Sequence, residues 1–148
     1  MLVRTVTQTI ESESGFLHPA LDIVATLPAD IQSKKIPISL VVGFKQEGPM
    51  NSGSGLACYY YAIPLVKERH MSLKSDGSNV VGVPLLDTSD DRIRDVTRRL
   101  ATIISEKFSR PCYVTWSSLP KEDTSILVTN HVYILKKCLD FLKAELSR

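Results

Sequence analysis

The sequence predicts an α+β fold, in which a mainly antiparallel β-sheet has two longer α-helices packed against one face. Up to residue 86, segments rich in β-branched residues follow one another as in a series of hairpins. Two segments of helical period, about 90–109 and 124–146, then enclose one more strand. The 148 residues show no internal repeat and no boundary between two self-sufficient cores, so we expect a single domain, 1–148.

Three segments precede the first glycine-rich stretch. Residues Leu2 to Ile10 are rich in Val, Ile and Thr, which predicts a strand. Residues 16–28 are mostly apolar, but Pro19 lies inside this segment and Pro28 ends it, so helix and strand both remain open. From Ile36 to Phe44, apolar residues occupy every second position, and this alternation predicts the clearest strand of the chain.

A glycine-rich stretch, 48–55, predicts a flexible loop that leads into another strand, Leu56 to Leu65. We expect the strands 36–44 and 56–65 to pair as an antiparallel hairpin with a long tip. A polar segment, 67–78, follows, and Asn79 to Leu86 predicts a short strand rich in valine.

The hydrophobic period changes after residue 88. Apolar residues at helical spacing predict an amphipathic helix over about 90–109, which Pro111 ends. Thr88 and Asp91 match a capping box at its start. The next strand, Cys112 to Ser117, has Cys112, Val114 and Trp116 on one face. The last helix, about 124–146, carries the apolar stripe Leu127, Ile134, Leu135, Cys138, Phe141 and Leu142.

Composition and charge exclude several classes of protein. The formal net charge is +2, too balanced for a strong nucleic-acid or membrane-surface field, so we expect neither partner. The first residues lack the apolar core of a signal peptide, and the longest apolar stretch, Leu56 to Val66, is too short to span a bilayer. Three widely spaced cysteines suit reduced thiols. We therefore expect a soluble protein of the cytoplasm, with the nucleus as a second compartment.

One acidic cluster, Asp87, Asp90 and Asp91, lies between a strand and a helix. Carboxylates in such a place can hold Mg²⁺ for phosphoryl chemistry, so a small metal-dependent phosphohydrolase is the alternative function. Helix capping and dipole complementarity explain the same residues, and no glycine-rich phosphate loop precedes a helix. We favour the capping interpretation and expect no metal or other cofactor.

No pair of residues makes a convincing nucleophile and base. His131 and Cys138 lie on the same predicted helix, but seven positions correspond to roughly 10 Å along its axis, too far for a hydrogen bond. We therefore assign no catalytic residue.

Five arginines lie in or just after the first helix: Arg92, Arg94, Arg98, Arg99 and Arg110. Because acidic residues are interleaved among them, a solvated helix face with local ion pairs is the favoured interpretation. A protein partner with an acidic surface remains open.

Three consecutive tyrosines give the best indication of a protein interface. Side chains alternate between the faces of a strand, so Tyr60 opposes Tyr59 and Tyr61. One face can pack on the core while the other presents tyrosine to a partner, although a strand buried on both faces is an equal alternative. We take Tyr59, Tyr61 and Ile63 as candidate partner-binding residues.

The chain also resembles a known family over essentially its whole length. The most telling segment is NVVGVPLLDTSDDRIRDVTRRLATIISEKFSRPCYVTWSSL, residues 79–119. With the opening MLVRTVTQTIESESGFLHPALDIVATLPAD and the run PISLVVGFKQE, it resembles the fungal form of the proteasome assembly chaperone 4 family. Animal members have a glycine between Leu-Leu and Asp-Thr, whereas Leu86 here runs directly into Asp87.

This resemblance implies a single proteasome-assembly-chaperone-like domain without enzymatic activity. Members of the family pair with a related small chaperone, proteasome assembly chaperone 3, as a heterodimer. The pair binds the fifth α-type subunit of the 20S proteasome, promotes formation of the α-ring and leaves as β subunits join. These are expectations from the resemblance alone.

Overall fold

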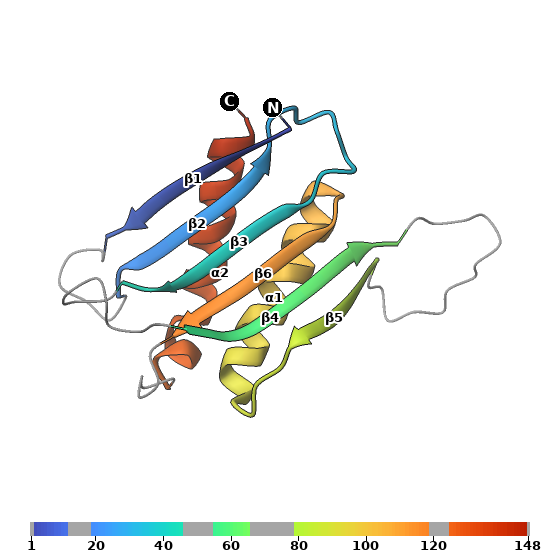
Figure 1. Cartoon of the computed structure of the whole chain (residues 1–148). Helices are drawn as coiled ribbons and strands as arrows, with labels where there is room; N and C mark the ends of the chain where they lie inside the picture. The colour runs from blue at the N-terminus through green and yellow to red at the C-terminus, as the bar shows by residue number, and fades with distance from the viewer. Residues whose placement is uncertain (1, 12–18, 46–54, 66–78, 119–124, 148) are drawn as a thin grey trace.

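One six-stranded sheet with both helices on the same side forms the fold (Figure 1). The computed structural model describes residues 2–11, 19–45, 55–65, 79–118 and 125–147. The elements are β1 (Val3–Ile10), β2 (Leu21–Pro28), β3 (Ile38–Phe44), β4 (Gly55–Pro64), β5 (Val80–Leu86), α1 (Asp91–Phe108), β6 (Cys112–Ser118) and α2 (Ser125–Leu146). The α+β class, the mainly antiparallel sheet and both long helices are confirmed.

The strands lie in the order β1-β2-β3-β6-β4-β5, and every neighbouring pair is antiparallel except β3 and β6, which are parallel. The expected hairpin between the segments 36–44 and 56–65 is therefore wrong, because β6 lies between β3 and β4. The physical reason is burial on both faces of β6. Val114 is fully buried under the helices and Thr115, which points to the other face, is also buried. Such a strand is best placed inside a sheet. The loop predicted at 48–55 lies almost wholly outside the described residues, as does the polar segment 67–78.

The ambiguous segment 16–28 forms a strand, β2, from residue 21 onward, while residues 16–18 lie outside the described part of the chain. Its burial alternates along the chain, with Leu21, Ile23, Ala25 and Leu27 fully buried. β2 pairs with β1 on one side and β3 on the other. The proline that ends the segment is tolerated because Pro28 stands at the last position of the strand.

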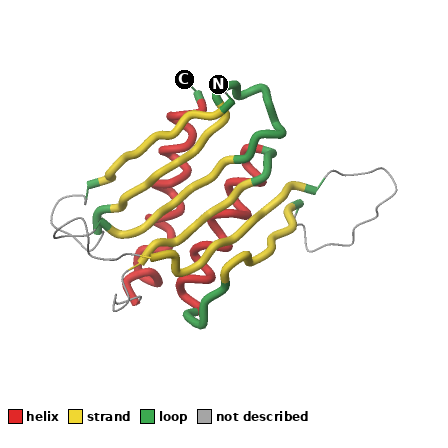
Figure 2. Tube along the Cα trace, viewed as in Figure 1, coloured by secondary structure: helices red, strands yellow, loops and turns green. Residues whose placement is uncertain are grey.

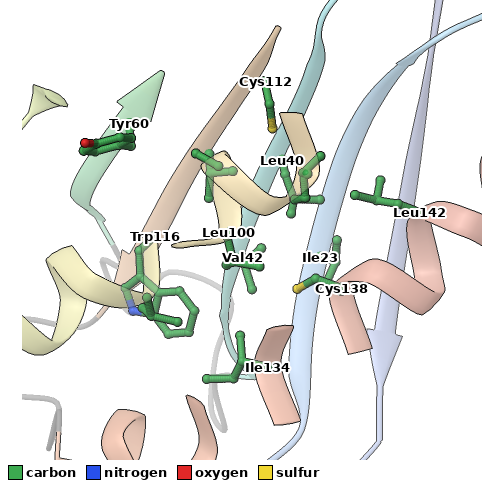
Figure 3. Close-up of a cluster of buried hydrophobic side chains, with 14 of the residues drawn as sticks. Ile23, Leu40, Val42, Tyr60, Leu100, Cys112, Trp116, Ile134, Cys138 and Leu142 are labelled. Atoms are coloured by element: carbon green, nitrogen blue, oxygen red, sulfur yellow. The ribbon is translucent and has the colours of Figure 1, made fainter. Parts of the chain in front are cut away.

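The hydrophobic core lies between the sheet and the two helices (Figure 3). Cys112, Val114 and Trp116 share the helix-facing side of β6, as expected, and all three are fully buried. The Trp116 ring meets the Phe44 ring edge-on, with 5.4 Å between centroids. The helices contribute side chains from their predicted stripes, among them Ile93, Val96, Leu100, Ile104, Leu127, Ile134, Cys138, Phe141 and Leu142. Full burial of a large aliphatic side chain contributes about 1.5–3 kcal/mol, so this layer supplies most of the stability.

The start of α1 differs from the predicted capping box. The N-cap residue is Asp90, whose side chain accepts a hydrogen bond from the backbone N–H of Arg92 at 2.9 Å. Thr88 lies two residues earlier, where its hydroxyl accepts from the backbone N–H of Asp90 at 3.1 Å. Asp90 has the extended backbone that an N-cap needs, and this geometry decides between the two oxygen-bearing side chains.

Of the helices that the structure describes, neither is long and apolar enough to cross a membrane.

Candidate interaction surface

The sheet has one face that no described element covers. Both helices pack against the same side, so the opposite side of the strands is presented to the surroundings (Figures 1 and 2). The strand register arranges the side chains of this second side in rows that cross all six strands. We call two of these rows, together with Ile63 and Val81, the open face. The first row is Thr7, Val24, Val41, Thr115, Tyr59 and Leu86; the second is Thr5, Thr26, Ser39, Tyr113, Tyr61 and Val83.

Several apolar side chains on the open face are more than one third exposed. Val24, Val41, Ile63, Val81 and Val83 have between 37% and 45% of their surface exposed. None of the residues in the two rows carries a charge. A sheet face that stays in water usually carries charged side chains, whereas protein interfaces are depleted of them at their centre. The open face therefore has the composition of a binding surface.

Two of the three predicted tyrosines lie on the open face, on β4, which is the strand next to the β5 edge of the sheet. Tyr60 is buried under the helices, whereas Tyr59 and Tyr61 point to the open face and are partly exposed, as the strand alternation predicted. Tyr61 stacks on Tyr113 of β6 with 4.5 Å between ring centroids, and Tyr59 lies 5.9 Å from the same ring. The structure thus brings two of the candidate residues together around a third tyrosine.

The remaining candidate, Ile63, lies two positions beyond Tyr61 on β4 and pairs with Val81 of β5. The sequence reasoning missed Tyr113, Val81 and Val83. The signal for Tyr113 was present, since this residue alternates with Cys112 and Val114 on the predicted strand. Its position beside Tyr59 and Tyr61 depends on the pairing of β6 with β4, which the sequence pattern did not reveal.

Burial within the tyrosine cluster affects the titration of Tyr59. Its pKa is raised above the ordinary value of 10.0, first because the hydroxyl is partly removed from water and then because Tyr113 lies nearby. The group is therefore neutral at physiological pH and can act as a hydrogen-bond donor or acceptor toward a partner.

The three carboxylates of the acidic cluster are bound by groups of the chain itself. Asp87 accepts from Arg94 Nε at 2.8 Å and from the backbone N–H of Thr88, while Asp91 contacts Arg94 Nη1 at 2.8 Å. Asp90 caps the helix. Among the described residues, no group of three or more His, Cys, Asp or Glu side chains is arranged to hold a metal ion. This geometry supports the capping interpretation and gives the phosphohydrolase alternative no specific observation in its favour.

The cysteines have no features of a nucleophile. Cys58, Cys112 and Cys138 are buried free thiols. Burial raises the pKa of all three and brings that of Cys138 to about 12, so the reactive thiolate form is strongly disfavoured at neutral pH.

The arginine-rich face of α1 is laced with local ion pairs, as expected. Arg94 contacts Asp87 and Asp91, Arg92 contacts Asp90 at 3.4 Å, and Arg98 contacts Asp95 at 3.5 Å. Arg110 is an exception and does not belong to a solvated face. Only 1% of its surface is exposed, because the guanidinium turns inward to bind backbone carbonyls of the β2–β3 connection.

An α+β domain whose partly apolar sheet face is covered by no described element has the kind of surface that protein-binding domains use. The family model of 20S proteasome chaperone assembly proteins 3 and 4 matches residues 1–143 of the chain. "Proteasome chaperone 4" of Saccharomyces cerevisiae (strain ATCC 204508 / S288c) is 75% identical over 147 residues, which are 99% of each protein. The chain therefore belongs to this family of 20S proteasome assembly chaperones, as a member of the chaperone 4 type.

A solved structure supports the same conclusion. It is described as "Crystal Structure of a Novel Chaperone Complex for Yeast 20S Proteasome Assembly". The chain in that structure is 65% identical to this one, the match covers 99% of both chains, and the TM-score is 0.80. The resemblance found in the sequence is thereby confirmed. Membership of an assembly chaperone family implies a non-enzymatic role.

Proposed function

We propose that this chain acts as one half of a heterodimer with proteasome assembly chaperone 3, and that the pair binds the fifth α-type subunit of the 20S proteasome. In this role the pair promotes formation of the α-ring and is released as β subunits join. The chain then works without catalysis, cofactor or nucleotide, in the cytoplasm and the nucleus.

The observation that carries the proposal is the open face. A lone domain in water gains nothing from an uncharged row of tyrosines and valines, but a partner sheet laid on it would remove that surface from water. Two sheets pack face to face about 10 Å apart, with the helices of each protomer left outside. We propose this arrangement for the heterodimer, with Tyr59, Tyr61, Ile63 and Tyr113 among the residues in contact.

Release by β subunits needs no chemical step under this proposal. A chaperone that occupies the surface of the α-ring where β subunits attach competes with them sterically, so their arrival shifts the binding equilibrium. Such exchange requires an interface of modest affinity toward the α-ring. The heterodimer contact itself can be more stable, because it persists through the exchange.

The test is a titration of purified chaperone 3 with this chain carrying Tyr59→Ser and Tyr61→Ser. We expect the affinity to fall about 10-fold or more, because tyrosines are enriched among the interface residues whose truncation costs about 2 kcal/mol or more. The matched control is Val128→Ser with Val132→Ser, which removes exposed apolar groups from α2 on the opposite side of the sheet. This control should bind chaperone 3 as the wild type does.

Two readouts separate loss of binding from loss of fold. Circular dichroism of the double tyrosine variant should match the wild type, because both side chains lie outside the helix-facing core. Thermal unfolding should remain cooperative but start at a lower temperature, because the ring contacts with Tyr113 are lost. Unchanged affinity for chaperone 3 in a folded variant would contradict the assignment of the open face.

A further inference from the structure

A groove lies on the helical side of the molecule, between α1 and the first half of α2. It has a volume of about 420 Å³ and is lined by charged residues of α1 and apolar residues of α2. The groove belongs to the side of the sheet opposite the open face, since both helices pack there (Figure 1). A protein bound to the open face would therefore leave the groove accessible.

The α2 wall of the groove exposes two valines. Val128 is 66% exposed and Val132 is 76% exposed, and their spacing of four residues places them side by side along the helix. They do not belong to the apolar stripe of α2, and they point away from the core. An exposed branched pair of this kind offers an apolar contact to an incoming side chain.

The α1 wall of the groove has a surplus of positive charge. Arg92, Arg98 and Arg99 line it against one carboxylate, that of Asp95, and Arg92 is also paired with Asp90 just outside the lining. Arg98 contacts Asp95 at 3.5 Å with both side chains more than half exposed, so this ion pair is weak and readily exchanged. Arg99 forms no ion pair within the part of the chain that the structure describes.

A polar group of α2 also lies in the groove without a partner. The Nε2 atom of His131 is buried and forms no hydrogen bond to any described residue. Burial and the nearby Arg99 lower the pKa of this histidine, so the ring is neutral at physiological pH. A neutral ring can donate or accept one hydrogen bond at this nitrogen when a ligand binds.

We propose that this groove docks a short acidic segment of the second protein partner, with an apolar side chain seated against the α2 valines and carboxylates facing Arg98 and Arg99. The occupant is acidic because the excess of arginines over carboxylates favours an anionic partner. It is a polypeptide because the exposed valines favour contact with an apolar side chain, which a phosphate group lacks. This inference rests on the proposed function, which requires two partners bound at once and therefore two separate surfaces.

The test uses the preformed complex of this chain with chaperone 3 and titrates it with purified fifth α-type subunit. Arg98→Glu with Arg99→Glu, and separately Val128→Ser with Val132→Ser, should each weaken binding of the subunit about 10-fold or more. Both variants should still form the complex with chaperone 3. The matched charge control is Lys34→Glu with Lys35→Glu, two exposed lysines in the connection between β2 and β3, which should leave the affinity unchanged.

The outcomes distinguish this inference from the function on which it rests. If the wild-type complex fails to bind the subunit, the proposed function fails and the inference falls with it. If the wild type binds and both groove variants bind equally well, only the groove assignment is overturned. Loss of binding in the arginine variant alone, together with arginine-dependent binding of a single-stranded oligouridine probe, would also overturn it in favour of a nucleic-acid site.

Discussion

Arg110 shows how much one residue can contribute when its environment differs from what its type suggests. Its guanidinium donates to the backbone carbonyls of Ile31 at 2.8 Å, Ser33 at 3.1 Å and Ile36 at 3.3 Å. It thereby fixes the connection between β2 and β3 to the end of α1. Burial lowers the pKa of the guanidinium, yet arginine stays charged, and the carbonyl oxygens compensate part of the cost of removing that charge from water.

We predict that Arg110→Met lowers the free energy of unfolding by about 2–4 kcal/mol, because three carbonyl groups lose their donor while the volume is largely kept. Urea unfolding measures the change. Arg98→Met is the control, since Arg98 is exposed and its loss should change stability by less than about 0.5 kcal/mol. Equal effects of the two substitutions would show that the buried hydrogen bonds of Arg110 contribute nothing.

The ion pair of Asp87 predicts a dependence of stability on pH. The hydrogen bond from Arg94, followed by that from the Thr88 backbone N–H, lowers the pKa of Asp87 below its ordinary value of 3.8. A carboxyl whose pKa is lower in the folded chain stabilises it fully at pH values well above 3.8. That contribution is lost as the pH falls through the lowered value.

We therefore expect the stability advantage of the wild type over Asp87→Asn to be constant near neutral pH and to shrink in acid. Urea unfolding of both proteins at a series of pH values, down to the lowest pH at which they fold, gives the comparison. A gap that stays the same throughout would mean that Arg94 does not hold the ionised form of Asp87.

At the scale of elements, the parallel pairing of β3 and β6 depends on a close approach at Gly43. A Cβ atom at this position would lie 2.5 Å from the backbone carbonyl oxygen of Ser117, nearer than real Cβ atoms come. Because the obstacle is backbone, it cannot turn aside as a flexible side chain could. The glycine thus permits the two strands to lie side by side at the end of the sheet where β4 also pairs with β6.

We predict that Gly43→Ala destabilises the fold by about 1–3 kcal/mol through displacement of β6 from β3. Gly55→Ala is the matched control, because a Cβ at the first position of β4 meets no atom within 4 Å. Its effect should stay within about 0.5 kcal/mol. Thermal or urea unfolding of the two variants compares them directly, and similar stabilities would contradict the close approach.

At the scale of the whole molecule, the three thiols report on the cooperativity of folding. Cys58 lies on β4, Cys112 on β6 and Cys138 on α2, and all belong to the same layer between sheet and helices. Figure 3 shows Cys112 and Cys138 in this layer. Reaction with a thiol reagent needs the thiolate form and access to the sulfur atom. In the folded chain, burial disfavours the thiolate and blocks access to it. A single domain would expose all three only on unfolding.

We predict that a disulfide reagent such as Ellman's reagent labels the native chain more slowly than the urea-unfolded chain by a factor of about 1,000 or more, given ordinary domain stability. The three cysteines should also react in parallel, which mass spectrometry of the labelled chain can follow. Fast labelling of one cysteine alone would indicate a separately opening unit and would contradict the prediction of a single domain.

In the candidate site, some features follow from the local sequence pattern, whereas others depend on contacts between segments far apart in the chain. The alternation along β4 placed Tyr59 and Tyr61 on one face, because the period of two is a property of an extended backbone. The partner ring of Tyr113 came from a strand more than fifty residues later in the chain. The mixing of acidic and basic residues along α1 correctly predicted its ion pairs. The same pattern wrongly suggested that Arg110 is exposed, because a local pattern of charges does not show whether a side chain is buried.

By itself, the sequence determined the fold class, the approximate bounds of both helices, the core-facing side of most elements and the family. The spacing of apolar residues is a property of each segment by itself, and similarity to a family adds up along the chain. Both can therefore be recognised without knowing which elements contact one another. Only the tertiary structure decided the strand order and the insertion of β6 between β3 and β4. The reason is that backbone hydrogen bonds between strands are the same for every sequence. The choice of neighbours therefore depends on the total surface that each arrangement removes from water.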